Sequence, residues 1–148
     1  MRLLIITSAC AALLGCGNPA EGPEESLRRW VAEAQDAAEN RDRAALMRKI
    51  SGRYADARGN DRKAVDQMLR YYFLRQDQVL LVSRIDGIEV SGETAGNVRL
   101  TTGMAGTGGG AALDFRADAY RFELELEHDG DDWMLIGARW GQVGQALR

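Results

Sequence analysis

Between residues 24 and 75, apolar residues recur at steps of three and four, a spacing that places them on one face of an α-helix. The pattern is interrupted twice, so it predicts three helices, at residues 24–40, 42–50 and 61–75. Asp42 is placed to cap the second helix, because an aspartate oxygen accepts a hydrogen bond from a free N–H group of the first turn. The residues between the second and third helices are expected to form a loop.

After Arg75 the apolar residues begin to alternate with polar ones, which is typical of half-buried antiparallel strands. Strands are predicted at residues 79–90, 98–104, 120–127 and 133–140, with a bulge or kink at Asp86-Gly87. Helices followed by an antiparallel sheet indicate the α+β class. A strongly twisted sheet of about four strands would hold the N-terminal helices in its concave face and form a half-open cone.

The first residues do not fit this pattern. Arg2 precedes an uncharged run from Leu3 to Leu14, whose twelve residues would span about 18 Å as a helix, well short of the roughly 30 Å hydrocarbon core of a bilayer. A charged start, a short apolar centre and a small-residue end are typical of a secretory signal peptide. Leu13-Leu14-Gly15-Cys16 resembles a bacterial lipobox, in which the cysteine is acylated and the chain is cut before it. An ordinary signal peptide that carries Cys16 by chance is the alternative.

These observations divide the chain into a lipoprotein signal peptide at 1–15, a lipidated cysteine with a flexible tether at 16–25, and a single domain at 26–148. Acyl chains on Cys16 would attach the protein to a membrane. Gly17, rather than aspartate, follows the cysteine. In Gram-negative lipoproteins an aspartate at this position favours retention at the inner membrane. In such a host the resemblance to a lipoprotein therefore points to the outer membrane, with the domain facing the periplasm.

Composition narrows the chemistry further. A length of 148 residues allows one domain, and 19 basic against 22 acidic side chains give a net charge of −3, which disfavours nucleic acid as a partner. Two cysteines and one histidine leave no metal cluster of the usual kind, and no motif indicates a cofactor. The histidine, His128, lies in a predicted hairpin turn, where a solvent-exposed structural role is expected.

The order of three helices and a curved sheet is accompanied by several local segments. These are Asn40-Arg41-Asp42, Ile50-Ser51 leading to Tyr54, Tyr72-Phe73-Leu74-Arg75, Tyr120-Arg121-Phe122-Glu123-Leu124 and Ala138-Arg139-Trp140. Together they resemble the nuclear transport factor 2-like (cystatin-like) superfamily, and in particular small proteobacterial lipoproteins of that superfamily. The resemblance implies a cone-shaped fold. It does not imply one activity, because the superfamily contains isomerases, cyclases, dehydratases, transport factors and binding modules, many of them homodimers.

The interior of the predicted cone supplies candidate ligand-binding residues. If Trp133 and Leu135 face inward, strict alternation along the strand places Arg139 inside too, where its guanidinium would bind an anion. The alternative places Arg139 in a salt bridge or on the surface, with Trp140 buried instead. The candidate residues are Tyr54, Tyr72, Tyr120, Trp133 and Arg139.

Three functional hypotheses follow. The first is a non-catalytic, lipid-anchored envelope protein that binds a small amphipathic ligand or a partner protein in its cone. The second is a small isomerase or hydrolase that uses a tyrosine–carboxylate pair in the same cavity. The third is a structural or assembly protein that forms homodimers through the outer face of the sheet. Against this hypothesis, the outward positions of strand 120–127 are charged and offer no apolar dimer interface.

Overall fold

The computed structural model describes residues 21–107 and 118–148. The predicted signal peptide, Cys16 and most of the tether lie outside these residues. Within them, no helix is both long enough and apolar enough to cross a membrane.

Three helices form, close to the predicted positions: α1 (Pro23–Glu39), α2 (Arg43–Arg48) and α3 (Arg62–Arg75). Helix α1 begins at Pro23, three residues before the expected start of the domain and inside the segment predicted as a tether. Pro23 occupies its first turn, where the N–H groups have no partner within the helix and a missing one costs nothing. The negative charges of Glu24 and Glu25 in the same turn interact favourably with the positive end of the helix dipole. The Asp42 side chain caps α2 as predicted, accepting a hydrogen bond from Ala45 N at 2.9 Å.

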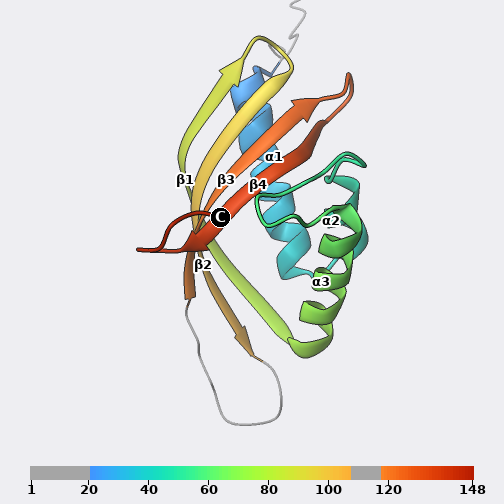
Figure 1. The fold of residues 1–148 in the computed structure, drawn as a ribbon, viewed down its shortest axis with the longest axis vertical. Helices are drawn as coiled ribbons and strands as arrows, with labels where there is room; N and C mark the ends of the chain where they lie inside the picture. Colours follow the sequence, from blue (N-terminus) through green and yellow to red (C-terminus); the bar gives the residue numbers. More distant parts are fainter. Residues whose placement is uncertain (1–20, 108–117) are drawn as a thin grey trace, which may run out of the picture.

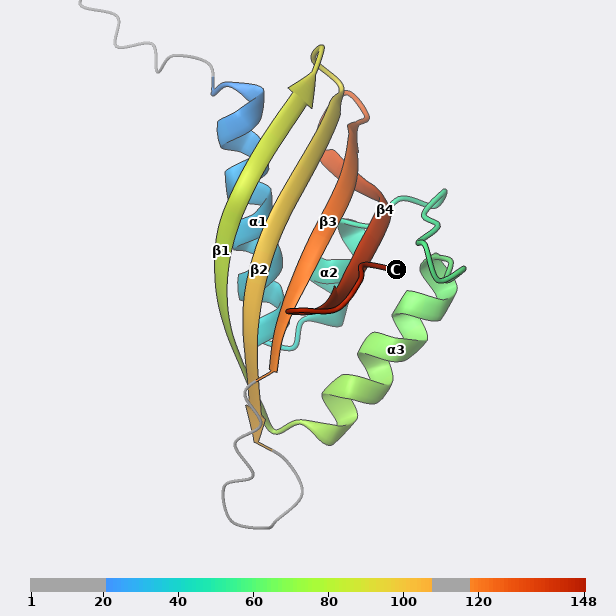
Figure 2. The same cartoon turned by 60° about the vertical axis from the view of Figure 1, so that its left-hand side comes forward.

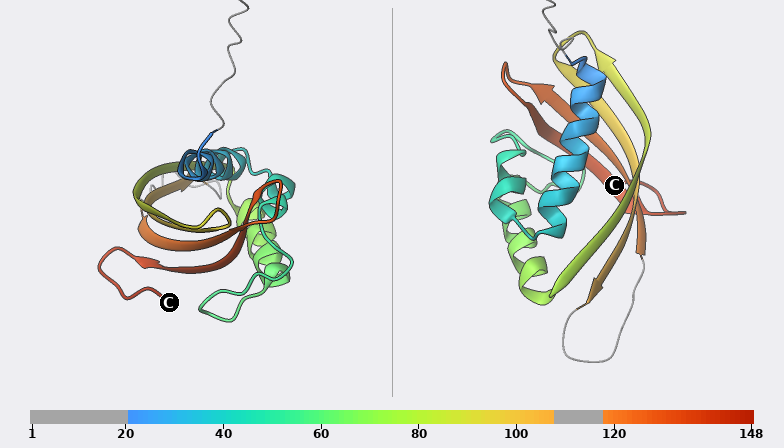
Figure 3. Two further views of the ribbon diagram at one scale, coloured as in Figure 1. Left: turned by 90° about the horizontal axis from the view of Figure 1, so that it is seen from above. Right: turned by 180° about the vertical axis from the view of Figure 1, so that it is seen from behind.

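Four strands follow in a simple meander: β1 (Gln78–Ser91), β2 (Ala95–Thr107), β3 (Asp118–His128) and β4 (Trp133–Gln142). They pair antiparallel in the order β1-β2-β3-β4. Figures 2 and 3 show the sheet curving around α1, with α2 and α3 beside β4. The predicted α+β class, with helices held in the concave face of a curved antiparallel sheet, is confirmed.

Two irregularities shape the sheet. The β1–β2 register shifts between Ile85 and Gly87, at the bulge predicted from Asp86-Gly87. A second shift was not predicted: Leu126 pairs with Leu135, but the preceding Glu125 pairs with Gly137, so Ile136 is an extra residue in β4. Because side chains alternate between faces, one extra residue reverses the faces of every later position in the strand.

The main core lies between α1 and the concave face of the sheet. Its buried residues are Leu27, Trp30, Val31, Val98, Leu100, Leu126 and Trp133. A second, smaller cluster joins α2 and the following loop to β4 and consists of Met47, Ile50, Tyr54 and Ala138. Helix α3 differs from both other helices because none of its residues is buried.

Candidate functional site

A cavity of about 830 Å³ lies between α3 and the concave face of the sheet. It is bounded by the C-terminal part of α1, by α3 and by all four strands. Most of its lining is aliphatic or aromatic, and its residues are Ala38, Tyr54, Val65, Met68, Leu69, Tyr71, Tyr72, Phe73, Gln76, Val79, Leu81, Met104, Asp118, Tyr120, Phe122, Leu124, Leu135, Ala138 and Trp140. Among the described residues, the lining contains one charged group, Asp118, which is solvent-exposed on its strand.

The cavity exists because α3 is held at its start and stands away from the sheet. Asp61 caps the helix by accepting a hydrogen bond from Ala64 N at 2.8 Å. Arg62 donates to the carbonyl oxygens of Ile50 at 3.0 Å and Met47 at 2.8 Å, which fixes the first turn to the end of α2. The apolar side of α3 therefore packs against the second core cluster only through Val65 and Leu69, and the rest of it faces the cavity.

Three of the five residues predicted to bind a ligand line this cavity: Tyr54, Tyr72 and Tyr120. Burial raises the pKa of Tyr72, and the neighbouring Tyr120 adds to the shift because two adjacent phenolates would repel each other. Within the described part of the chain, neither hydroxyl has a hydrogen-bond partner. These two phenols are thus available as neutral donors to a molecule in the cavity.

Tyr54 differs from the other two tyrosines because its hydroxyl already has a partner. It is 5% exposed, and its hydroxyl donates to the Asp56 carboxylate at 3.4 Å. Burial raises the pKa of Tyr54, and the negative charge and hydrogen bond of Asp56 raise it further. The phenol therefore stays protonated well beyond neutral pH.

The Asp56 carboxylate, beside Tyr54, was not among the residues predicted from the sequence. It is 8% exposed and accepts hydrogen bonds from Arg58 N, Asn60 N and Asn60 Nδ2, each at 2.9 Å. The signal was present in the loop as Asp56-Ala57-Arg58-Gly59-Asn60, because aspartate commonly accepts from the backbone two residues ahead in turns. Gly59, with φ +81°, supplies the left-handed position that the turn requires.

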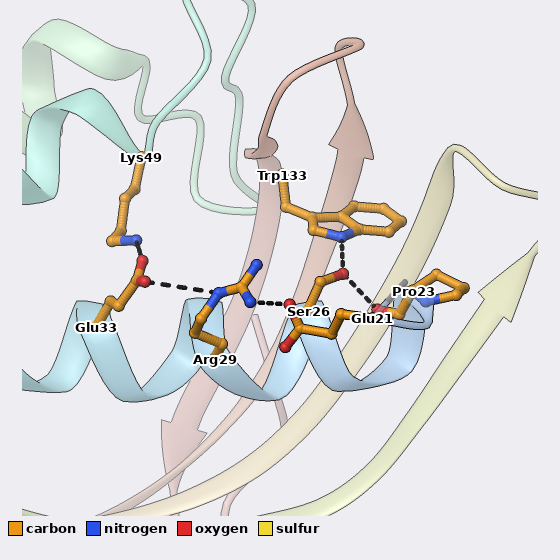
Figure 4. Close-up of polar contacts among 7 residues, drawn as sticks. All are labelled: Glu21, Pro23, Ser26, Arg29, Glu33, Lys49 and Trp133. Carbon is orange, nitrogen blue, oxygen red and sulfur yellow. Dashed lines mark hydrogen bonds and ion pairs between the residues drawn. The ribbon is translucent and has the colours of Figure 1, made fainter. Parts of the chain in front are cut away.

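Trp133 lies in the main core, away from the cavity. It is 4% exposed, and its indole Nε1 donates to Ser26 Oγ of α1 at 2.8 Å (Figure 4). Along the same helix, Arg29 pairs with Glu21 and with Glu33, and Lys49 Nζ lies 2.6 Å from a Glu33 oxygen (Figure 4). The contacts of Trp133 thus fasten the start of α1 to β4.

The prediction that Arg139 faces the interior is wrong. Its Nη2 lies 2.7 Å from an oxygen of Glu123, the residue opposite it on the convex face of the sheet. The extra residue Ile136 explains the error, because alternation counted from Trp133 fails after the bulge. Trp140 takes the inward position instead and lines the cavity, as the alternative interpretation had it.

No three histidine, cysteine, aspartate or glutamate side chains within residues 21–107 and 118–148 are grouped so that they could hold a metal ion. The lining of the cavity supplies apolar side chains, phenol hydroxyls, the Gln76 amide and the Asp118 carboxylate.

No protein-family model and no curated protein matches the chain. Solved structures do resemble it. A candidate scytalone dehydratase from Novosphingobium aromaticivorans has a TM-score of 0.73 at 11% identity, covering 84% of this chain and 85% of its own. A candidate dehydratase of the nuclear transport factor 2-like family from Streptomyces avermitilis has a TM-score of 0.70 at 12% identity, covering 81% and 96%.

Bd1075 from Bdellovibrio bacteriovorus has a TM-score of 0.65 at 14% identity over 78% of this chain, and the match spans only 40% of that longer protein. At such low identities the likeness concerns the fold alone. The described residues have the nuclear transport factor 2-like, or cystatin-like, fold, which confirms the resemblance seen in the sequence.

Proposed function

We propose that this protein is a non-catalytic binding module that holds a small amphipathic molecule in the cavity beneath α3. The observation that supports this proposal is the cavity itself: about 830 Å³ with a mostly apolar lining and two phenol hydroxyls that have no partner among the described residues. Ligand sites in proteins are typically concave, mostly apolar and about 300–1,000 Å³ in volume. The apolar part of such a molecule would contact the α3 side chains, and its polar group would accept from Tyr72 or Tyr120.

The energetics of α3 favour an occupant. An isolated helix shorter than about 15 residues is marginal in water, and most helical stability comes from packing an apolar face. Helix α3 has 14 residues and buries none of them. A bound apolar molecule would give this helix the packing that the protein alone leaves incomplete.

The enzyme alternative rests on the Tyr54–Asp56 pair beside the cavity and on neighbours that are candidate dehydratases. A general acid or base works best when its pKa lies near the working pH. The raised pKa of Tyr54 moves this phenol away from that range, and backbone and amide donors already occupy the Asp56 carboxylate. The pair fits a structural role better, so we favour binding over catalysis.

The assembly alternative has less support. On the convex face of the sheet, ion pairs join Arg99 to Glu89 at 2.5 Å and Arg139 to Glu123 at 2.7 Å. At these positions the convex face is charged, whereas stable interfaces bury an apolar centre.

The experiment that tests the binding function uses the uncharged fluorescent probe N-phenyl-1-naphthylamine and a variant that fills the cavity. Leu69→Trp places an indole in the space, whereas Val143→Trp, at a side chain 54% exposed away from the cavity, is the matched control. We expect saturable binding to the unaltered protein, a loss of at least about tenfold in affinity for Leu69→Trp, and no change for Val143→Trp. Equal affinity in all three proteins would contradict the proposal.

The proposed site of action is the periplasmic side of a bacterial membrane, most consistently the outer membrane, with acyl chains on Cys16 as the anchor. This part is supported by the lipobox-like residues of the sequence. Intact mass of the protein from native membranes should show a chain that begins at Cys16 and carries acyl chains. A Cys16→Ser variant that stays as firmly bound to membranes would contradict the anchor.

A further inference from the structure

Exposed apolar side chains are concentrated at one end of the molecule. Six large hydrophobic residues are exposed in the described part of the chain, and five of them lie between residues 68 and 82. They are Met68 (44%), Tyr71 (60%), Leu74 (78%), Leu80 (54%) and Val82 (69%). We name residues 68–82, where the end of α3 turns into β1, the α3–β1 corner. Monomeric proteins seldom expose large side chains in such concentration without a partner for them.

The corner is also basic, although the chain as a whole has a net charge of −3. Arg70 and Arg75 belong to it, and Arg41 reaches it by donating to the Gln76 carbonyl oxygen at 2.8 Å. Within residues 21–107 and 118–148 these three arginines form no ion pair, and Arg75 stacks over the Tyr71 ring at 4.8 Å from its centroid. Some arginines elsewhere form ion pairs, as Arg84 does with Asp86 at 2.8 Å. Asp77 is the single acid among residues 68–82, and Glu39 reaches the corner by accepting a hydrogen bond from Leu81 N at 2.9 Å.

Leucine and tyrosine side chains set among unpaired arginines are typical of protein surfaces that rest on anionic lipid headgroups. A second copy of the chain is a less suitable partner for the corner than an anionic lipid surface. A twofold contact of corner on corner would bring the arginines of both copies together, and like charges repel.

The corner borders the mouth of the cavity, because Met68, Tyr71, Gln76 and Val79 line that cavity. Among the described residues it also lies at the opposite end from the start of α1 (Figures 1 and 3). Helix α1 alone has 17 residues, a length of about 26 Å. A lipid surface at the corner would therefore face the cavity and lie away from the proposed anchor.

We propose that the α3–β1 corner docks on an anionic lipid surface, with the apolar side chains in the interface and Arg41, Arg70 and Arg75 against the headgroups. The biological purpose of this docking rests on the proposed function, because an amphipathic ligand would enter or leave the cavity from that surface. The docking contact itself depends on the corner alone.

The test uses the full chain purified from native membranes and mixed with neutral phosphatidylcholine vesicles, which take up the protein through its anchor. Labelled vesicles that contain phosphatidylglycerol are then added, and their capture is measured by flotation. We expect capture that weakens as salt rises, because salt screens the arginines. Arg75→Gln should lower the capture affinity about fivefold. Leu74→Ser should lower it about tenfold or more.

Val143→Ser is the matched control, because Val143 is the exposed hydrophobic residue outside the corner. It should leave capture unchanged. Leu74 is 78% exposed, so its variant should keep the thermal midpoint of the unaltered protein. Three results would overturn the proposal. Neutral labelled vesicles could be captured as well as anionic ones, Val143→Ser could lower capture as much as Leu74→Ser does, or the chain could self-associate through the corner without vesicles.

Failure of the proposed function is distinguishable from failure of docking. A chain that does not float with neutral vesicles contradicts the anchor, and docking is then measured by direct sedimentation with the anionic vesicles. If the unaltered protein does not bind N-phenyl-1-naphthylamine, the proposed binding function of the cavity is contradicted. Neither result changes the expected effects of Leu74→Ser and Val143→Ser on lipid docking.

Discussion

Replacing Leu69 and Leu126 separately by alanine measures whether α3 belongs to the packed core. Leu126 is 2% exposed in the main cluster, so its truncation removes buried carbons and leaves a void. Such substitutions cost about 2.7–5.0 kcal/mol, the upper values where the surroundings cannot collapse. Leu69 is only partly buried, and its side chain lines a space that is already open.

For Leu69→Ala the cost is therefore the transfer term alone, without a new closed void. Three carbon groups at about 0.8 kcal/mol each give an upper limit near 2.4 kcal/mol, and partial exposure reduces it to about 1–1.5 kcal/mol. Alanine also has a slightly higher helix propensity than leucine, which offsets a few tenths of this. Leu126→Ala should thus cost at least twice as much as Leu69→Ala.

The assay is urea unfolding of both variants and the unaltered protein, followed by tryptophan fluorescence and far-ultraviolet circular dichroism. Equal losses of unfolding free energy, both above about 3 kcal/mol, would refute the reasoning, because Leu69 would then be packed like a core residue. Adding a saturating apolar ligand should raise the stability of the unaltered protein, by about 2.7 kcal/mol at one hundred times its dissociation constant. Leu126→Ala should keep most of that gain if the cavity wall is intact.

Three further results are expected. Ser26→Ala should lower the unfolding free energy by about 1–3 kcal/mol, measured by urea unfolding, because it leaves the buried Nε1 of Trp133 without an acceptor; a loss below about 0.5 kcal/mol would contradict that role. The raised pKa of Tyr54 keeps the phenol neutral in the folded state while the unfolded chain ionises near its ordinary value of 10.0, so stability present below that pH should fall as pH rises above it. Tyr54→Phe should reduce this alkaline loss, and an equal loss in both proteins would contradict the raised pKa of Tyr54, whose largest cause is burial. Arg139→Ala should change stability by less than about 1 kcal/mol and leave probe binding unchanged, because the Arg139 side chain is 54% exposed and its partner Glu123 is partly exposed; weakened binding would return Arg139 to the cavity.

Much of the fold could be predicted from local signals. Asp42 and Asp61 each cap a helix through their own side chains, so the starts of α2 and α3 are visible in the sequence. The change from helical spacing to alternation marks the end of the helices at Arg75. The bulge beside Gly87 was also predicted, because a glycine within a strand weakens regular pairing.

The candidate site was predicted in part. Tyr72 and Tyr120 belong to a helix and a strand whose apolar faces are clear, and both line the cavity. Arg139 was placed on the wrong face because no bulge was predicted at Ile136, although Gly137 follows that residue as Gly87 follows Asp86. Asp56 was missed because its partners are backbone groups of a loop, which no periodicity reveals.

The sequence by itself determined the order of helices and strands, their approximate ends and the α+β class, because propensity, capping and periodicity act between residues close together in the chain. Only the tertiary structure decided which residues share the cavity. The register of β4 after Ile136 depends on pairing with β3, and the open space beneath α3 depends on how Arg62 holds that helix to α2. Both are long-range constraints, in which one residue of register or one point of attachment changes the neighbours of an entire element.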